Sequence, residues 1–104
     1  MNILSKDDYL VDHDGSIAID CEAVSVVGLL AYCFVCSWTG TLTGTLRLQV
    51  SNDKNIWHSI DSHAMGGAAG DELFNQSLFG YKFARIRLNG VGGAGVLNIS
   101  VAGK

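Results

Sequence analysis

The residue pair with the most familiar chemical spacing is Cys33 and Cys36, which form a Cys-x-x-Cys motif. Such a motif can bind zinc or carry a redox disulfide. The surrounding segment is apolar and strand-like, and residues three apart on a strand point to opposite faces of the sheet. Zinc also needs four ligands, and the chain has no second motif of this kind. We therefore expect Cys21, Cys33 and Cys36 to be free structural thiols that hold no metal.

The three histidines suggest either a catalytic triad or a metal site. His58 and His63 flank Asp61, and His13 lies between two aspartates. No His-x-His or His-Glu-x-x-His pattern occurs, and no Gly-x-Ser-x-Gly turn supplies a nucleophile. We interpret the three as exposed loop histidines and expect a protein that is not an enzyme and has no catalytic residues.

Two further kinds of site could be formed by oxygen ligands and glycines, namely a calcium site and a phosphate-binding loop. Calcium binds carboxylate and amide oxygens. Residues of this kind in the expected loops are Asp12, Asp14, Asn52, Asp53 and Asp71. Their spacing lacks the later ligands of an EF-hand, so turn formation explains them better. The glycines of 90–95 resemble a phosphate cradle only in composition, because a strand follows where a helix is needed. We read this segment as a flexible hairpin loop and expect no cofactor.

Several aromatic side chains could line a carbohydrate groove: Tyr32, Trp38, Trp57, Phe74, Phe79 and Tyr81. Most aromatic residues of so small a domain belong to its core. A carbohydrate-binding module nevertheless stays open as an alternative.

The elements that must position these residues are short strands. Alternation is clearest at 45–51, where Leu46, Leu48 and Val50 face inward and Arg47 and Gln49 outward. It recurs at 82–88 and 96–102, and 29–38 is apolar on both faces, as in a central strand. Ser16–Asp20 also alternates, and 56–60 is expected to pair with 45–51, with Trp57 as its large packing residue. We predict a mobile loop at 62–71. The segment 72–79 is ambiguous between a short strand and a helical turn.

These patterns predict an all-β fold. We expect an antiparallel β-sandwich or jelly roll of about seven to eight short strands. Residues 1–15 would form an N-terminal arm or an edge strand, and 16–104 a single sandwich domain.

Composition narrows the class of partner. The 104 residues carry a formal charge of −3, and only 16% are charged while 48% are hydrophobic. This balance disfavours nucleic acid, which needs a basic surface. No segment has the roughly 20 apolar residues of a membrane-spanning helix, and no signal peptide is visible. We expect no membrane partner and folding in a reducing cytoplasm.

Two stretches carry a resemblance. Residues 38–53 read WTGTLTGTLRLQVSND and are followed by Trp57, while 80–88 read GYKFARIRL and lead through a glycine loop to GVLNISV at 95–101. Over roughly 37–103 the chain resembles small virion proteins of tailed phages, and the same segments are similar to discoidin-like jelly rolls. The phage resemblance implies a capsid decoration or cement protein that binds the major capsid protein or other virion proteins as a dimer or trimer. It also implies a place in the virion after synthesis in the host bacterial cytoplasm, with a tail or fibre role in host attachment as the alternative.

The expected strand at 45–51 makes a testable prediction. Leu48→Asp should abolish folding because it places a charge in the core, while Gln49→Asp should be nearly neutral. Thermal melts of both variants measure this, and equal tolerance would show that the register is wrong.

Overall fold

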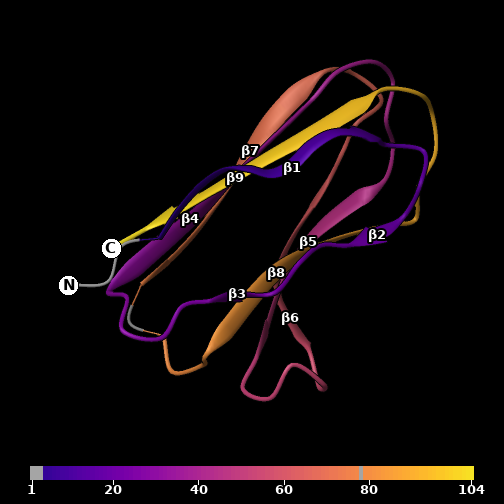
Figure 1. Ribbon diagram of the computed structural model, residues 1–104. Coiled ribbons are helices and arrows are strands. Elements are labelled where there is room, and N and C mark those ends of the chain that lie inside the picture. Colours follow the sequence, from indigo (N-terminus) through magenta and orange to yellow (C-terminus); the bar gives the residue numbers. More distant parts are fainter. Residues whose placement is uncertain (1–3, 78) are drawn as a thin grey trace.

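The computed structural model describes residues 4–77 and 79–104, and every regular element among them is a strand. The strands are β1 (Leu4–Asp14), β2 (Ile19–Asp20), β3 (Val24–Ser25), β4 (Ala31–Trp38), β5 (Thr45–Ser51), β6 (His58–Ala64), β7 (Gly70–Ser77), β8 (Phe83–Asn89) and β9 (Val96–Gly103). Figure 1 shows two sheets packed face to face. The first has the order β1-β9-β4-β7, and the second has the order β2-β8-β5-β6, with β3 also paired to β8. All pairs are antiparallel, so the predicted all-β antiparallel sandwich is confirmed.

The core fills the space between the sheets and follows the predicted alternation. Leu46 and Leu48 on β5 face Ile99 on β9 and Phe34 on β4 from the opposite sheet, and all four are at most 1% exposed. The inward residues of β8 and β9 are likewise buried: Ala84, Ile86, Leu88, Leu97, Ile99 and Val101. The inward register expected for 45–51, 82–88 and 96–102 is therefore confirmed.

Several local expectations need correction. β4 is central in its sheet, but its outer face meets solvent, and Val35 on that face is 40% exposed. The alternation expected for Ser16–Asp20 contracts to the two residues of β2, and Ile17 is 56% exposed. Both sides of the predicted mobile loop at 62–71 belong to strands β6 and β7, and the ambiguous segment is a strand through Ser77. Residue 78 lies outside the described residues.

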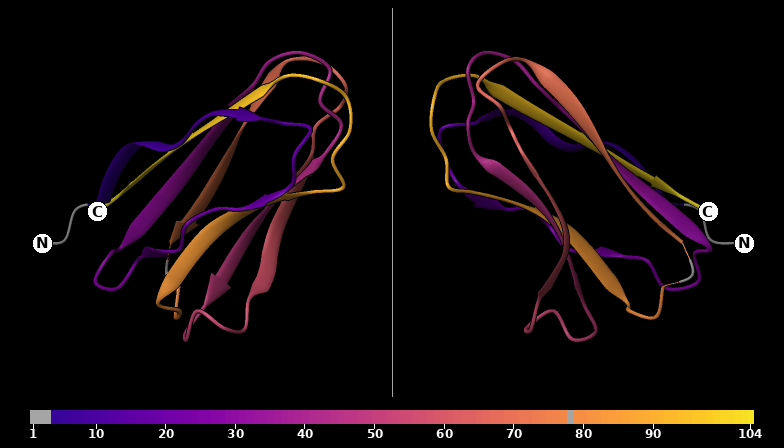
Figure 2. Two further views of the ribbon diagram at one scale, coloured as in Figure 1. Left: turned by 45° about the vertical axis from the view of Figure 1, so that its right-hand side comes forward. Right: turned by 180° about the vertical axis from the view of Figure 1, so that it is seen from behind.

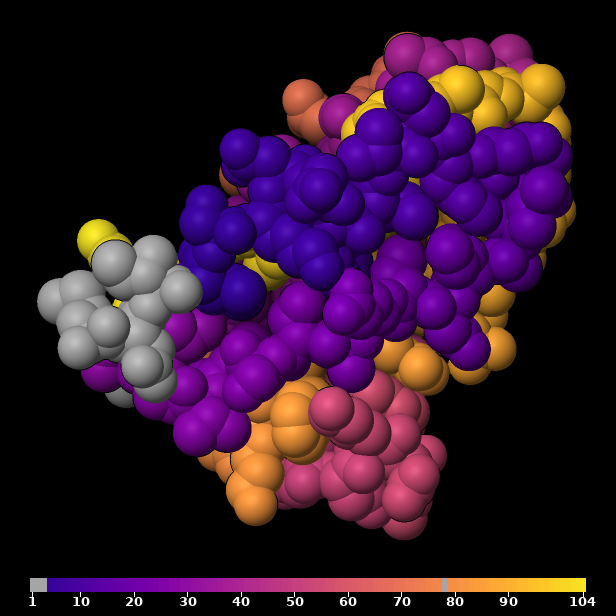
Figure 3. Space-filling view, viewed as in Figure 1, coloured from indigo at the N-terminus to yellow at the C-terminus, as the bar shows by residue number. Residues whose placement is uncertain are grey.

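One side of the sandwich is covered by the N-terminal third of the chain. β1 pairs with β9 at the edge of the first sheet, and β2 and β3 pair with β8 at the edge of the second. Figure 3 shows this side as a continuous layer from indigo to purple, with the turn between β5 and β6 projecting below it. Tyr9 on β1 packs this layer against the core. It is 7% exposed, and its ring lies edge-on to that of Phe34, with 5.3 Å between the ring centroids.

The Thr-Gly repeat and the glycine loop pair with each other. Thr39, Thr41 and Thr43 donate backbone hydrogen bonds to the carbonyls of Val96, Ala94 and Gly92. The two segments lie together at one end of the sandwich (Figure 2). Gly40 (φ 78°) and Gly93 (φ 76°) have left-handed backbones, and a Cβ on either would collide with a carbonyl oxygen of the other segment. The glycines of this loop thus permit close backbone packing, which replaces the expected flexible hairpin.

Tyr9 supplies a stability prediction. Its hydroxyl donates to the Glu22 carbonyl and accepts from the Ile86 N–H at 3.4 Å. Tyr9→Phe leaves both backbone groups without this partner, so we expect a loss of about 1–3 kcal/mol in the free energy of unfolding. Urea denaturation measures it.

Tyr81→Phe is the matched control. The hydroxyl of the half-buried Tyr81 lies 2.9 Å from that of Tyr32 and donates to Gln76 Oε1 at 3.2 Å. Both partners are side chains that line a surface hollow, where water can replace the lost hydroxyl. Its loss should be smaller, and equal shifts of the two urea midpoints would contradict the role given to Tyr9.

Candidate functional site

The outer face of the second sheet gathers all three arginines of the chain. Arg47 lies on β5 directly opposite Arg87 on β8, and Arg85 lies opposite Gln49. Asp20 on β2 pairs with Arg87 from the other side. Because Leu46, Leu48, Ile86 and Leu88 point into the core, their neighbours must point outward. We call the set of Asp20, Arg47, Gln49, Trp57, Arg85 and Arg87 the arginine face.

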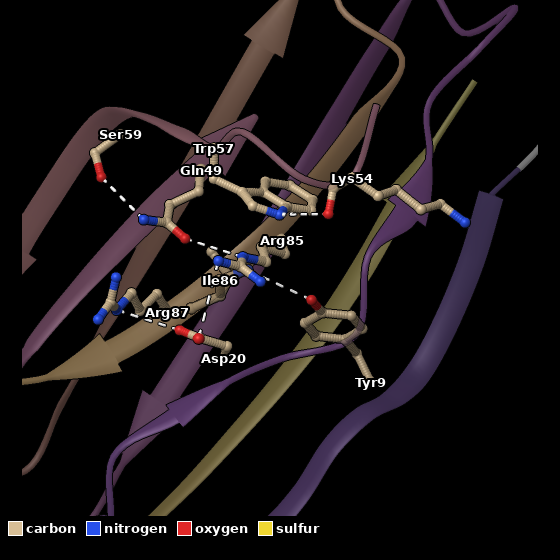
Figure 4. A network of polar contacts seen from close by, with 9 residues as sticks. All are labelled: Tyr9, Asp20, Gln49, Lys54, Trp57, Ser59, Arg85, Ile86 and Arg87. Atoms are coloured by element: carbon tan, nitrogen blue, oxygen red, sulfur yellow. Dashed lines mark hydrogen bonds and ion pairs between the residues drawn. The ribbon is translucent and has the colours of Figure 1, made fainter. Parts of the chain in front are cut away.

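Arg85 is the best-held side chain of the arginine face. Its guanidinium lies 4.1 Å from the centre of the Trp57 ring, and its Nε donates to Gln49 Oε1 at 2.9 Å. An Asp20 oxygen lies 3.9 Å from its Nη2, and the side chain is only 17% exposed. Figure 4 shows Trp57, Gln49 and Asp20 around this one group. Stacking and hydrogen bonding together fix the guanidinium in one orientation.

The neighbours of Arg85 are fixed in turn. Gln49 Nε2 donates to Ser59 Oγ at 3.2 Å, and Trp57 Nε1 donates to the Lys54 carbonyl at 3.2 Å. Gln49 does face away from the core, as predicted, but it is only 5% exposed because this network covers it. The expectation of a neutral Gln49→Asp therefore needs revision. Losing its two side-chain bonds should destabilise the fold by about 1–3 kcal/mol, still less than a charge at Leu48.

The other two arginines remain more available. Arg87 Nε lies 3.2 Å from Asp20 Oδ1 with its side chain 43% exposed, and Arg47 Nε donates to Asn89 Oδ1 at 3.3 Å. Asp20 is the carboxylate shared by Arg85 and Arg87. A hollow lined by Arg47, Ser59, Ile60, Asp61 and Ser62 adjoins them. The arginine face thus carries local positive charge on an acidic protein, and guanidinium pairs favour carboxylates.

All three thiols are free, and Cys21 and Cys36 are buried while Cys33 is half-buried on the other face of β4. Burial raises the pKa of Cys21 to about 12 and raises the pKa of Cys33 and Cys36 above the ordinary thiol value. Among the described residues no group of three His, Cys, Asp or Glu side chains could hold a metal ion.

The histidines do not form a triad. All three lie on strands rather than in loops, which corrects the sequence interpretation. His63 Nδ1 lies 2.9 Å from Glu72 Oε2, His13 Nε2 lies 2.7 Å from the Ile17 carbonyl, and His58 is exposed. The His63–Glu72 contact links β6 to β7 and so joins the two sheets at one corner.

The oxygen ligands act mainly in turns. Asp53 Oδ1 accepts from the backbone N–H groups of Ile56 and Asn55 and from Ser51 Oγ, and these bonds lower its pKa. Asp14 accepts from both the N–H and the hydroxyl of Ser16, and its pKa is also lowered. Asn52 Oδ1 accepts from the Lys82 N–H at 3.0 Å. Asp12 and Asp71 are exposed strand residues on β1 and β7.

The aromatic residues divide between core and surface. Tyr32, Trp38 and Phe74 are buried, and Phe79 and Tyr81 stack on each other at 5.2 Å against the core. Trp57 is the one of these six that joins the arginine face. It packs against Arg85, whereas the sequence suggested the core for most of the aromatic residues. The cross-strand register of Arg47 with Arg87 was the signal that could have revealed this face.

Comparison with known proteins shows a similarity of fold but no relative in sequence. No family model matches the chain, and no curated protein sequence does. Among solved structures it is similar to the SPBc2 prophage-derived protein YomS, at a TM-score of 0.62 and 8% identity over 99% of this chain and 94% of that one. The chain has the fold of a prophage-derived protein. At this identity the likeness concerns the fold alone. No helix within the described residues could span a membrane.

The thiol environments predict selective labelling. In the native protein at about pH 8, an alkylating reagent should modify Cys33 and leave Cys21 and Cys36 protonated and shielded. Mass spectrometry should show one adduct on the folded chain and three after denaturation. Cys33→Ser should remove the native adduct, and rapid native labelling of Cys36 would contradict the burial described for β4.

Proposed function

We propose that the protein is a non-enzymatic structural component of a phage virion, most specifically a capsid decoration or cement protein. It would bind the major capsid protein or other virion proteins and stabilise the head by protein–protein contact. Its place would be the phage particle, after synthesis in the host bacterial cytoplasm. The sequence resemblance and the fold shared with a prophage-derived protein support this proposal.

The observation that carries the proposal is the arginine face. Tryptophan and arginine are enriched where protein interfaces derive most of their binding energy. Arg85 is already ordered by Trp57, Gln49 and Asp20, so little side-chain freedom remains to be lost on binding. Arg47 and Arg87 stand opposite each other, and a carboxylate from a partner would relieve their mutual repulsion. The fitting partner is an acidic protein surface.

Repetition would turn a modest contact into firm attachment. A symmetric shell presents many copies of the same acidic surface, and linked copies of a decoration protein bind them with avidity. A small face with a few well-held anchors is sufficient for this role.

A role in host attachment is the second candidate, as a carbohydrate-binding module or a tail- or fibre-associated protein. The polar hollow beside the arginine face favours it, because Ser59, Ser62 and Asp61 offer hydrogen-bonding groups to sugar hydroxyls. The opposed arginines favour an acidic protein partner instead, since neutral sugars bring no carboxylate to them.

Co-sedimentation with assembled capsids tests the proposal. We expect Arg87→Glu and Trp57→Ala each to weaken binding by about tenfold or more, because each removes a central group of the contact. Lys104→Glu is the matched control for Arg87→Glu, since it makes the same change of charge at the exposed residue that follows β9, away from the arginine face. Binding of the wild type should fall as salt is raised.

Two outcomes would contradict the proposal. One is a wild-type chain that fails to bind shells yet binds a glycan saturably, which would support host attachment. The other is shell binding that is unchanged by both substitutions on the arginine face.

A further inference from the structure

A sandwich that does not close leaves strands at its sheet edges, and most edges of this one are protected. β1 has two breaks in its register with β9, a left-handed residue at Asp12 (φ 50°) and several exposed aspartates. β2 and β3 are two residues long. β6 has a register break opposite Leu48 and Gln49. Bulges, charges and shortness are the usual means of preventing edge-to-edge pairing.

β7 has none of these protections along most of its length. It pairs with β4 without interruption from Ala31↔Ser77 to Trp38↔Gly70. It contains no Lys, Arg or Pro, and of its two carboxylates Glu72 is bound to His63. Within the part of the chain that the structure describes, β7 ends the first sheet and no strand pairs with its outer side (Figure 2).

The backbone groups at this outer side can be identified. Ala31 and Lys104 exchange backbone hydrogen bonds, and the Thr39 N–H donates to Val96. Odd-numbered residues of β4 therefore direct their N–H and C=O groups toward β9, and even-numbered residues direct theirs toward β7. The partners of those even-numbered residues on β7 are Gly70, Glu72, Phe74 and Gln76. It follows that Asp71, Leu73, Asn75 and Ser77 direct their backbone groups away from the sheet.

The same residues direct their side chains to the outer face of the first sheet. Leu73 is 54% exposed and lies directly opposite Val35, which is 40% exposed. The two form an apolar pair beside the free edge. Polar residues flank Leu73 on the same face, with Asp71 on one side and Asn75 on the other.

We propose that β7 pairs antiparallel with β7 of a second copy of this chain, about a two-fold axis through Leu73. Antiparallel self-pairing is two-fold symmetric by nature, so the same edge serves both copies. In this register Leu73 lies opposite Leu73 of the second copy, and Asp71 lies opposite Asn75. The carboxylates are thereby kept apart, while Leu73 and Val35 of both copies form one apolar stripe across the joint. The two first sheets become one continuous sheet.

This inference is independent of the proposed function, because the arginine face lies on the other sheet. The dimer would leave both arginine faces open. Its formation can be measured on the purified chain without any shell.

Sedimentation analysis over a range of concentrations is the first test. We expect a dimer for the wild type and dimerisation weakened by about tenfold or more in Leu73→Lys and Asn75→Pro. Leu73→Lys brings two like charges together at the axis. Asn75→Pro removes an N–H from the free edge without removing one directed toward β4, and proline is tolerated on edge strands. Val96→Lys is the control, since it charges an exposed position of β9 in the same sheet.

Disulfide trapping tests the register. In a Cys33→Ser background, Leu73→Cys should form an intermolecular disulfide on mild oxidation, because opposed residues of a hydrogen-bonded pair lie about 5.5 Å apart. Asn75→Cys is the matched control and should not, because it faces Asp71 of the second copy. Circular dichroism verifies that each variant is folded.

Three results would overturn the proposal. These are a wild type that stays monomeric at every concentration, a dimer that neither Leu73→Lys nor Asn75→Pro weakens, and a β7 edge that pairs only with a strand of a different virion protein.

Discussion

The strict alternation of side chains along β4, β5, β8 and β9 is the constraint on which the rest of the structure depends. Phe34, Leu48, Ile86 and Ile99 are all at most 1% exposed, and they fill the space between two sheets that touch through these inner faces. A shift of one residue in any of these strands would exchange its two faces. The same constraint therefore decides where the polar residues go, and it places Arg47, Arg85 and Arg87 together on one outer surface.

That outer surface shows how polar residues become ordered without belonging to the core. Trp57 offers a ring to Arg85, Gln49 accepts from its Nε, and Asp20 supplies the opposite charge. Each contact is worth little alone at a surface. Together they bury Gln49 almost fully and leave Arg85 with one geometry, while Arg47 and Arg87 keep partners in Asn89 and Asp20 and remain partly exposed. An ordered centre with available neighbours is typical of a contact surface.

The parts of this fold that could be predicted are those in which one strand carries its own pattern. Leu46-x-Leu48-x-Val50 and Leu97-x-Ile99-x-Val101 identify their inward faces without reference to any partner. β2 was expected only as a longer alternation over Ser16–Asp20, because two residues carry no period of their own. The hairpin partner expected at 56–60 is β6, and its bounds at His58–Ala64 were missed because nearly all its side chains are exposed. The close packing of Gly40 and Gly93 depends on two segments far apart in sequence. The arginine face was missed for a related reason, since it requires the pairing of β5 with β8 as well as the outward direction of each residue.

Net charge conceals how this chain distributes its charges. The formal value of −3 results from scattered acids and a few bases in the sequence, yet four aspartates lie on β1 and the arginines lie on the second sheet. The two groups serve different physical ends. β1 pairs with β9 on one side, and its other side is an edge of the first sheet. The aspartates of β1 oppose the approach of another strand to that edge. The arginines cannot form such a barrier, because they lie on β5 and β8, the inner strands of a sheet whose order is β2-β8-β5-β6. Their placement on a face instead of an edge suits a surface that receives a partner. β7 differs from β1 in that its middle, residues 73–76, has no charged side chain to oppose another strand.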